Sequence, residues 1–191
     1  MRLYDSELDA GAYSARLMLS LLRLPHGRVP VNRFPGQEAP QVPELHDGDI
    51  TASGTVAVLR HLAARYAPQW LTPGDSPADQ WLSRETSRSF APRQARDSAL
   101  FTDAGPAGAL VARAAAVLRS LDDQLVAGEL AGTFWIGGAR PLTADVAMFP
   151  VAALSGDYGV EHDEFPALRR WIRRFRALPG FITMPGIPQF Y

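Results

Sequence analysis

The sequence predicts a mixed α+β domain followed by an all-helical domain, and three observations support this division. Short apolar alternations and an Asp-Gly turn signal occur in the first third of the chain. Three prolines and a glycine then gather in residues 67–77, and helical periodicity follows them. We therefore expect a first domain over residues 1–68, a linker over 69–77 and a helical domain over 78–191.

The chain opens with a predicted strand and helix. Residues 1–5 alternate in polarity as a strand does, and residues 12–24 carry apolar side chains at helical spacing. Asp9 precedes this helix as a candidate N-cap, and Pro-His-Gly at 25–27 ends it.

A second strand, a hairpin and a second helix complete the first domain. Residues 28–34 suit an edge strand because Pro30 has no N–H for a ladder. Residues 41–45 and 49–53 flank His-Asp-Gly, a turn signal typical of hairpins. Apolar spacing then predicts a helix over 54–66.

The remaining chain is predicted to be helical. Four segments show the helical period, over residues 78–101, 108–128, 143–156 and 165–181. Thr143 or Asp145 is expected to cap the third of these helices.

Composition excludes several classes of protein. The 191 residues are 47% hydrophobic and 20% charged with a net charge of -1, as expected for a globular protein that binds no nucleic acid. No secretory signal or membrane-length apolar run is visible, so we expect a cytoplasmic protein without membrane contact. There is no cysteine, and the four histidines lack metal-ligand spacing, so no metal is predicted.

Three segments carry a resemblance to a known family. "LYDSELDAGAYSARLMLSLLRL", "QVPELHDGDITASGTVAVLRHLA" and "FWIGGARPLTADVAMFP" resemble, in this order, the cytosolic glutathione S-transferases, and the chain's last segment is similar to bacterial members. The resemblance implies an α+β thioredoxin-like N-terminal domain followed by an all-α C-terminal domain. It also implies a homodimer, glutathione as co-substrate and a small-molecule electrophile.

Three residues match the family's glutathione-binding positions. The resemblance implies a cis Val42-Pro43 bond whose backbone edge pairs with the cysteinyl part of glutathione. It also implies that Ser53 and the start of the following helix bind the γ-glutamyl carboxylate. A serine at a helix start is equally explained as a helix cap, and the two roles are compatible.

The group that activates the thiol is less clearly matched. Aligned through the first helix, Asp9 stands where some members carry serine, which leaves Tyr13 and Ser14 as the catalytic candidates. Tyr13 is alternatively a core residue and Ser14 a solvent-facing one. Tyr4 and Ser6 are further hydroxyl donors near the end of the first strand.

The first domain departs from the family pattern at two places. Ala52 stands where the family commonly has an acid or amide for the ligand's amino group. Only residues 36–40 separate Pro35 from Gln41, too few for the helix that usually covers the glycyl end. Both changes are expected to weaken glutathione binding. In the helical domain, Leu142 replaces the family's Ser or Thr.

An electrophile would bind against the helical domain. Trp81, Phe90, Arg93 and Phe101 are candidates for its pocket, although aromatic residues at helical spacing also suit a core. The expected activity is transfer or addition of the glutathione thiolate. The alternatives are a glutathione-independent isomerase, cyclase or lyase, and a non-catalytic binding module.

Overall fold

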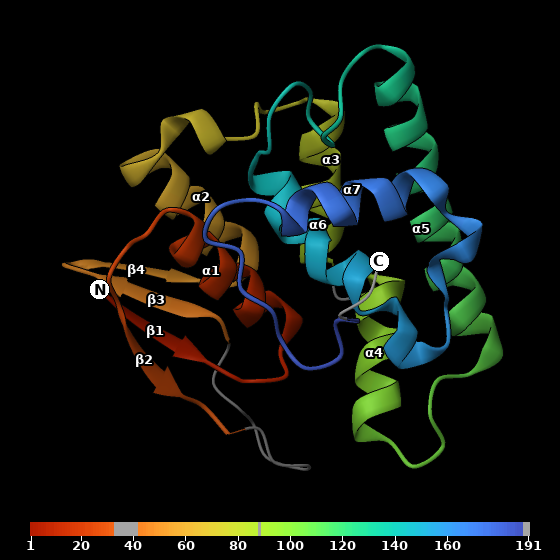
Figure 1. Ribbon diagram of the computed structural model, residues 1–191. Coiled ribbons are helices and arrows are strands. Elements are labelled where there is room, and N and C mark those ends of the chain that lie inside the picture. The colour runs from red at the N-terminus through yellow and green to blue at the C-terminus, as the bar shows by residue number, and fades with distance from the viewer. Residues whose placement is uncertain (33–41, 88, 189–191) are drawn as a thin grey trace.

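The computed structural model describes residues 1–32, 42–87 and 89–188. Within them, the amino-terminal domain holds one four-stranded sheet and two helices (Figure 1). Strands β2 and β1 are parallel, and β1, β3 and β4 are antiparallel neighbours in the order β2-β1-β3-β4. The elements are β1 (Arg2–Asp5), α1 (Ala10–Leu21), β2 (Gly27–Pro30), β3 (Glu44–Asp47), β4 (Ile50–Ser53) and α2 (Thr55–Tyr66).

The sheet is buried on one face because its side chains alternate. Leu3 and Leu45 pair across β1 and β3 and are fully buried, together with Leu17 of α1 and Leu59 of α2. Helices α1 and α2 lie on one side of the sheet and pack against the helical domain (Figure 1). This packing fixes where the first turns of both helices lie.

Apart from an isolated bridge between Trp135 and Gly138, the regular elements in the described part of the second domain are helices, with α6 at the centre. Every residue of α6 except Val151 is buried. The rings of Phe149 and Phe175 stack with centroids 4.4 Å apart. The elements are η1 (Pro68–Trp70), α3 (Pro77–Thr86), α4 (Ala91–Phe101), α5 (Gly108–Leu130), α6 (Thr143–Ala153), η2 (Ser155–Tyr158), η3 (His162–Glu164) and α7 (Pro166–Arg176).

Polar groups from three segments complete the start of α6. The Asp145 carboxylate accepts hydrogen bonds from Leu142 N at 2.9 Å, Ile136 N at 3.0 Å and Trp171 Nε1 at 2.9 Å. The hydroxyl groups of Thr72, in the linker, and Thr143 form a hydrogen bond of 2.8 Å. Thr72 Oγ1 also accepts a hydrogen bond from the amide of Ala144 at 3.0 Å. Thr72 thus supplies the capping hydroxyl that Leu142 lacks, and Asp145 acts as predicted.

The segment after α7 crosses α1 on the outside (Figure 1). Tyr13 Oη donates to the carbonyl of Ile182 at 2.6 Å, and Ser20 Oγ donates to that of Gly180 at 2.7 Å. A Cβ on Gly180 would lie 2.8 Å from Ser20 O, so glycine permits this close approach.

The predicted elements are confirmed in type and order, but their bounds differ in several places, most of all at the last helix, which ends at Arg176 and not at residue 181. The hairpin turn lies at Gly48 and Asp49, one residue later than the predicted turn, because Asp47 pairs with Ile50. The predicted helix over 78–101 is two helices, α3 and α4, separated at residues 87–90. The first helix ends at Leu21, before the Pro-His-Gly signal, and the predicted short segment at 36–40 lies outside the described residues.

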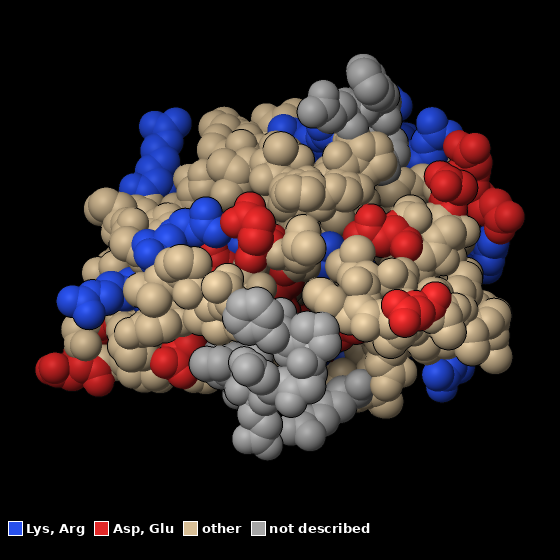
Figure 2. Space-filling view, turned by 90° about the horizontal axis from the view of Figure 1, so that it is seen from below, with Lys and Arg blue, Asp and Glu red and all other residues tan. Residues whose placement is uncertain are grey.

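The surface carries small groups of both charges. On the face seen in Figure 2, arginines and acidic residues are interspersed, in keeping with a net charge of -1. No helix in the described part of the chain combines the length and apolar character needed to cross a membrane.

Candidate functional site

The start of α1 is occupied by a carboxylate. Asp9 is the N-cap, as predicted, and its Oδ1 accepts a hydrogen bond from Ala12 N at 2.7 Å. A Cβ added to Gly11 would lie 2.2 Å from Thr55 Oγ1 and 3.5 Å from Pro43 Cδ. Gly11 therefore lets the first turn of α1 pack directly against the start of α2 and against Pro43.

The Val42-Pro43 bond is cis, which confirms the prediction. Pro43 is buried, and its carbonyl accepts from Gly54 N at 2.8 Å. This hydrogen bond ties the segment before β3 to the start of α2. The cis peptide bond and the start of α2 therefore lie side by side.

Ser53 lies at the exposed end of β4 and is bound to an acid. The strand register places Glu44 opposite Ser53, whose Oγ donates to the Glu44 carboxylate at 2.8 Å. His46 Nε2 lies 2.7 Å from the same carboxylate. These hydrogen bonds, that of His46 first, lower the pKa of Glu44. Ser53 is not the helix cap, because Gly54 takes that position and has no side chain with which to cap α2.

A second acid lies behind the start of α2. Glu85 of α3 is buried, forms an ion pair with Arg93 and accepts a hydrogen bond from the Thr55 hydroxyl. Burial raises the pKa of Glu85, against the opposing effect of the Arg93 guanidinium. Thr55 and Glu85 thus join the two domains beside Gly11.

Of the predicted hydroxyl donors, Tyr13 and Ser14 are buried in the core, and Tyr4 pairs with Glu44 across β1 and β3. Tyr13 is fully buried and bound to Ile182 O, and its burial raises the pKa of the phenol above its ordinary value. Ser14 is also fully buried, and its Oγ donates to Ala10 O at 3.3 Å. These positions favour the core interpretation for Tyr13, and Ser14 is not solvent-facing. The ring of Tyr4 contacts His46, and Ser6 lies in the loop before α1.

The candidate electrophile residues are dispersed. Trp81 is 3% exposed and donates to Gln124 Oε1, and Phe90 is 6% exposed, so both belong to the core. Phe101 is 49% exposed at the end of α4. Arg93 alone of the four lines a cavity between the domains.

That cavity has a volume of about 20 Å³ and lies between α1, α3, α4 and α6. Ser14, Glu85 and Tyr158 line it, and the buried Tyr158 hydroxyl has no hydrogen-bond partner among the described residues. Such a volume holds about one water molecule, whereas drug-sized ligands occupy about 300 Å³ or more. The cavity therefore suits a bridging water and not an electrophile.

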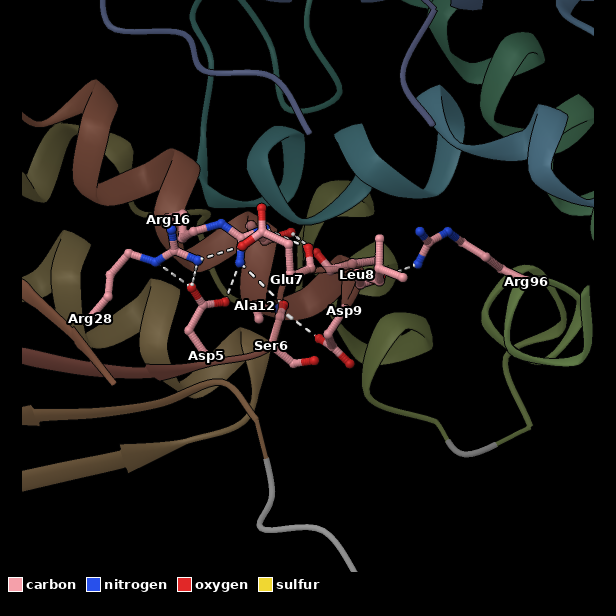
Figure 3. Close-up of polar contacts among 11 residues, drawn as sticks. Asp5, Ser6, Glu7, Leu8, Asp9, Ala12, Arg16, Arg28 and Arg96 are labelled. Carbon is pink, nitrogen blue, oxygen red and sulfur yellow. Dashed lines mark hydrogen bonds and ion pairs between the residues drawn. The ribbon is translucent and has the colours of Figure 1, made fainter. Parts of the chain in front are cut away.

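Two arginines fix the loop that leads to Asp9 (Figure 3). Arg16 of α1 donates to the carbonyls of Ser6 and Glu7 at 3.2 and 3.1 Å. Arg96 of α4 donates to Leu8 O at 2.6 Å, from the helical domain. The position of the α1 start thus depends on both domains.

The sequence interpretation missed Glu44, Thr55, Glu85 and Arg96. Glu44 lies opposite Ser53 because the turn falls at Gly48 and Asp49, whereas a register counted from the predicted Asp-Gly turn would place it opposite Thr51. Glu85 and Arg96 meet the first domain only through tertiary packing. Among the residues that the structure describes, no three His, Asp or Glu side chains gather as metal ligands.

Comparisons with known proteins find similar folds. No family model and no curated protein matches the chain. A possible glutathione S-transferase from Rhodopseudomonas palustris matches with a TM-score of 0.75 and 25% identity over 98% of each chain. A glutathione S-transferase from Pseudomonas fluorescens gives 0.80 and 21%, over 96% of this chain and 98% of its own. Ure2p in complex with glutathione gives 0.79 and 17%, over 94% and 90%.

Proposed function

The chain has the glutathione S-transferase fold, and on this premise we propose that it binds glutathione along the Val42-Pro43 edge and transfers or adds the thiol to a small electrophile. The observation that carries the proposal is the cis Val42-Pro43 bond beside a helix start capped by Gly54. A backbone edge can pair with an extended peptide, and the amides of a helix start favour its carboxylate.

Glu44 offsets the loss of an acid at Ala52. Its carboxylate lies beside Ser53 and is partly exposed, so it is available to the ammonium group of a γ-glutamyl ligand. The ligand's carboxylate would then lie toward the α2 amides and its ammonium toward Glu44. This arrangement supports binding despite the change at position 52.

The start of α1 is less favourable for the thiolate of glutathione than the start of α2 is for its γ-glutamyl end. A hydroxyl at the start of α1 would donate a hydrogen bond to a thiolate, whereas the Asp9 carboxylate carries a negative charge that opposes one. Free thiols have a pKa of about 8.5, so only a few per cent would be ionised at neutral pH without such help. We therefore expect slow transfer by the native chain.

A second candidate is a glutathione-binding protein without transfer activity. The observation that favours it is the burial of Tyr13 and Ser14 together with the 20 Å³ cavity where an electrophile would enter. Both candidates predict binding, and only the first predicts turnover.

Thermal denaturation with glutathione tests binding. A ligand at about 100 times its Kd adds about 2.7 kcal/mol to the free energy of unfolding, so millimolar glutathione should raise the Tm. Glu44→Gln should weaken binding about tenfold by removing a charge-assisted contact, whereas Asp49→Asn, in the exposed hairpin turn, should leave it unchanged. A wild-type Tm that does not move with glutathione would refute both candidates.

Turnover separates the two candidates. Conjugation of 1-chloro-2,4-dinitrobenzene above the uncatalysed rate supports transfer, and binding without turnover supports the second candidate. The implied homodimer and cytoplasmic location stay predictions. Light scattering tests the homodimer. Two exposed apolar residues that a dimer interface can cover are Leu130, 86% exposed, and Phe134, 45% exposed.

A further inference from the structure

An open groove lies between α1, the segment that enters β2 and the chain after α7. Its volume is about 620 Å³, within the range of about 300 to 1,000 Å³ typical of small-molecule sites. Leu19, Leu24, Pro25 and Ile182 form its apolar walls. The groove shares no lining residue with the inter-domain cavity or with the Val42-Pro43 edge.

The groove is basic. Among the described residues, its lining contains Arg16, Arg23, Arg28 and His26 and neither Asp nor Glu. An apolar wall beside several guanidinium groups suits an anion that carries an apolar body.

Among the described residues, Arg16 and Arg28 form ion pairs with Asp5 and Glu7, neither of which lines the groove. Arg16 and Arg28 share the single carboxylate of Asp5, whose side chain is fully buried (Figure 3). Arg28 Nε donates to Asp5 Oδ2 at 2.7 Å, while 46% of its side chain remains exposed. Asp5 therefore holds both arginines in place and neutralises one of them.

Glu7 occupies the exposed side of Arg28 as a weak internal anion. Its Oε2 accepts from Arg28 Nη2 at 3.0 Å, and 65% of its side chain is exposed. Exposed ion pairs contribute little stability, so a ligand with two negative charges can displace Glu7.

Arg23 adds a charge from an unusual backbone position. It is exposed and has a φ of 54°, in the left-handed region that glycine adopts without cost. Its amide donates to Ser20 O and that of Leu24 donates to Leu19 O, both at 2.9 Å, and these bonds close the end of α1. Helix termination alone would be served better by glycine, which points to use of the side chain.

We propose that this groove binds a small organic phosphate with an aryl or alkyl group, held by Arg23 and Arg28 with the apolar group against Leu24 and Ile182. The phosphate replaces Glu7 at Arg28. The site is independent of glutathione binding and involves no covalent step.

Isothermal titration with phenyl phosphate, inorganic phosphate and phenol tests the proposal. Phenyl phosphate should bind about tenfold more tightly than either fragment, because it alone supplies both charge and apolar area. Arg23→Gln should weaken phenyl phosphate binding about fivefold, and Glu7→Gln should strengthen it about threefold by removing the competing anion.

Matched controls separate the groove from general charge effects. Arg113→Gln and Glu161→Gln make the same charge changes at exposed positions elsewhere and should leave affinity unchanged. Arg23→Gly removes the side chain and relieves its backbone, so it should lower affinity without lowering the Tm.

Three results would overturn the proposal. They are equal affinity for phenol and phenyl phosphate, equal losses in Arg23→Gln and Arg113→Gln, and no gain in Glu7→Gln. Saturating glutathione should not displace phenyl phosphate. Displacement would place phenyl phosphate at the Val42-Pro43 edge and would refute its binding in the groove. Failure of glutathione to bind would bear only on the proposed function.

Discussion

The first backbone N–H groups of α6 and of α2 have no partner within their own helix, and the two helix starts differ in what surrounds these groups. At α6, Asp145 and Thr72 satisfy the free backbone groups from within the protein. At α2, Gly54 provides no side chain, and the nearby Ser53 hydroxyl donates to Glu44 at the surface. A helix start closed by buried side chains stabilises the fold, whereas one capped by glycine has no side-chain acceptor for its first amides.

The largest expected effect is at the buried helix start. Asp145→Ala leaves the amides of Ile136 and Leu142 and the indole N–H of Trp171 without their acceptor. Urea unfolding should show a loss of about 4 kcal/mol, since each buried unsatisfied group costs about 1 to 3 kcal/mol. Asp163→Ala, at a side chain 88% exposed, is the control and should change little.

Removing the hydroxyl supplied by the linker should cost less. Thr72→Val keeps the shape but removes the acceptor for Ala144 N and the contact with Thr143. The free energy of unfolding should fall by about 1 to 2 kcal/mol, as for other lost caps. Thr183→Val at an exposed position should be neutral. An equal effect in both variants would show that Thr72 does not cap α6.

The start of α1 lies between the two cases, because Asp9 caps it at the edge of the candidate site. Asp9→Ser keeps a capping oxygen and removes the charge, so the free energy of unfolding should change by less than about 0.5 kcal/mol. If glutathione binds there, kcat/KM for conjugation should rise about tenfold because a hydroxyl favours the thiolate. An unchanged kcat/KM with unchanged glutathione affinity would place the thiol elsewhere.

The smallest expected effect is a pH dependence of the free energy of unfolding, caused by His162 at the end of α6. His162 is buried with Nε2 2.7 Å from Ala152 O and 2.8 Å from Ser155 Oγ, and burial lowers its pKa. The unfolded chain therefore takes up the proton first, so stability falls as the pH drops below about 6.5. Urea unfolding at pH 7.5 and 5.0 should show a smaller drop in His162→Gln. The same drop in both proteins would assign the pH dependence to other groups.

Local pattern and resemblance predicted much of the fold. Asp9 as N-cap, the edge position of β2 and the cis Val42-Pro43 bond are confirmed. The apolar face of α1 was also predictable, since its spacing is intrinsic to the helix. These features depend on short segments, whose local chemistry is visible in the sequence.

The site was less predictable because it depends on what the second domain covers. Ser14 looks like a solvent-facing hydroxyl on an isolated helix, yet it is buried once the helical domain packs on α1, whereas Tyr13 begins the apolar face of α1 and is buried as that face predicts. Glu85 meets Thr55 across the domain boundary, and no local pattern encodes that pairing. Ser53 suggested a cap, but the register of β3 and β4 directs it to Glu44.

The two hydrogen bonds of Arg96 couple the start of α1 to the helical domain. Arg96 bonds Asp157 through Nε at 2.8 Å and Leu8 O through Nη1 at 2.6 Å, so the residue before Asp9 is attached to the helical domain. A ligand that prefers one angle between the domains must then prefer one position of the α1 start. If glutathione binds at the Val42-Pro43 edge, an occupant on the helical side would change the affinity for glutathione by the same factor by which glutathione changes the affinity for that occupant.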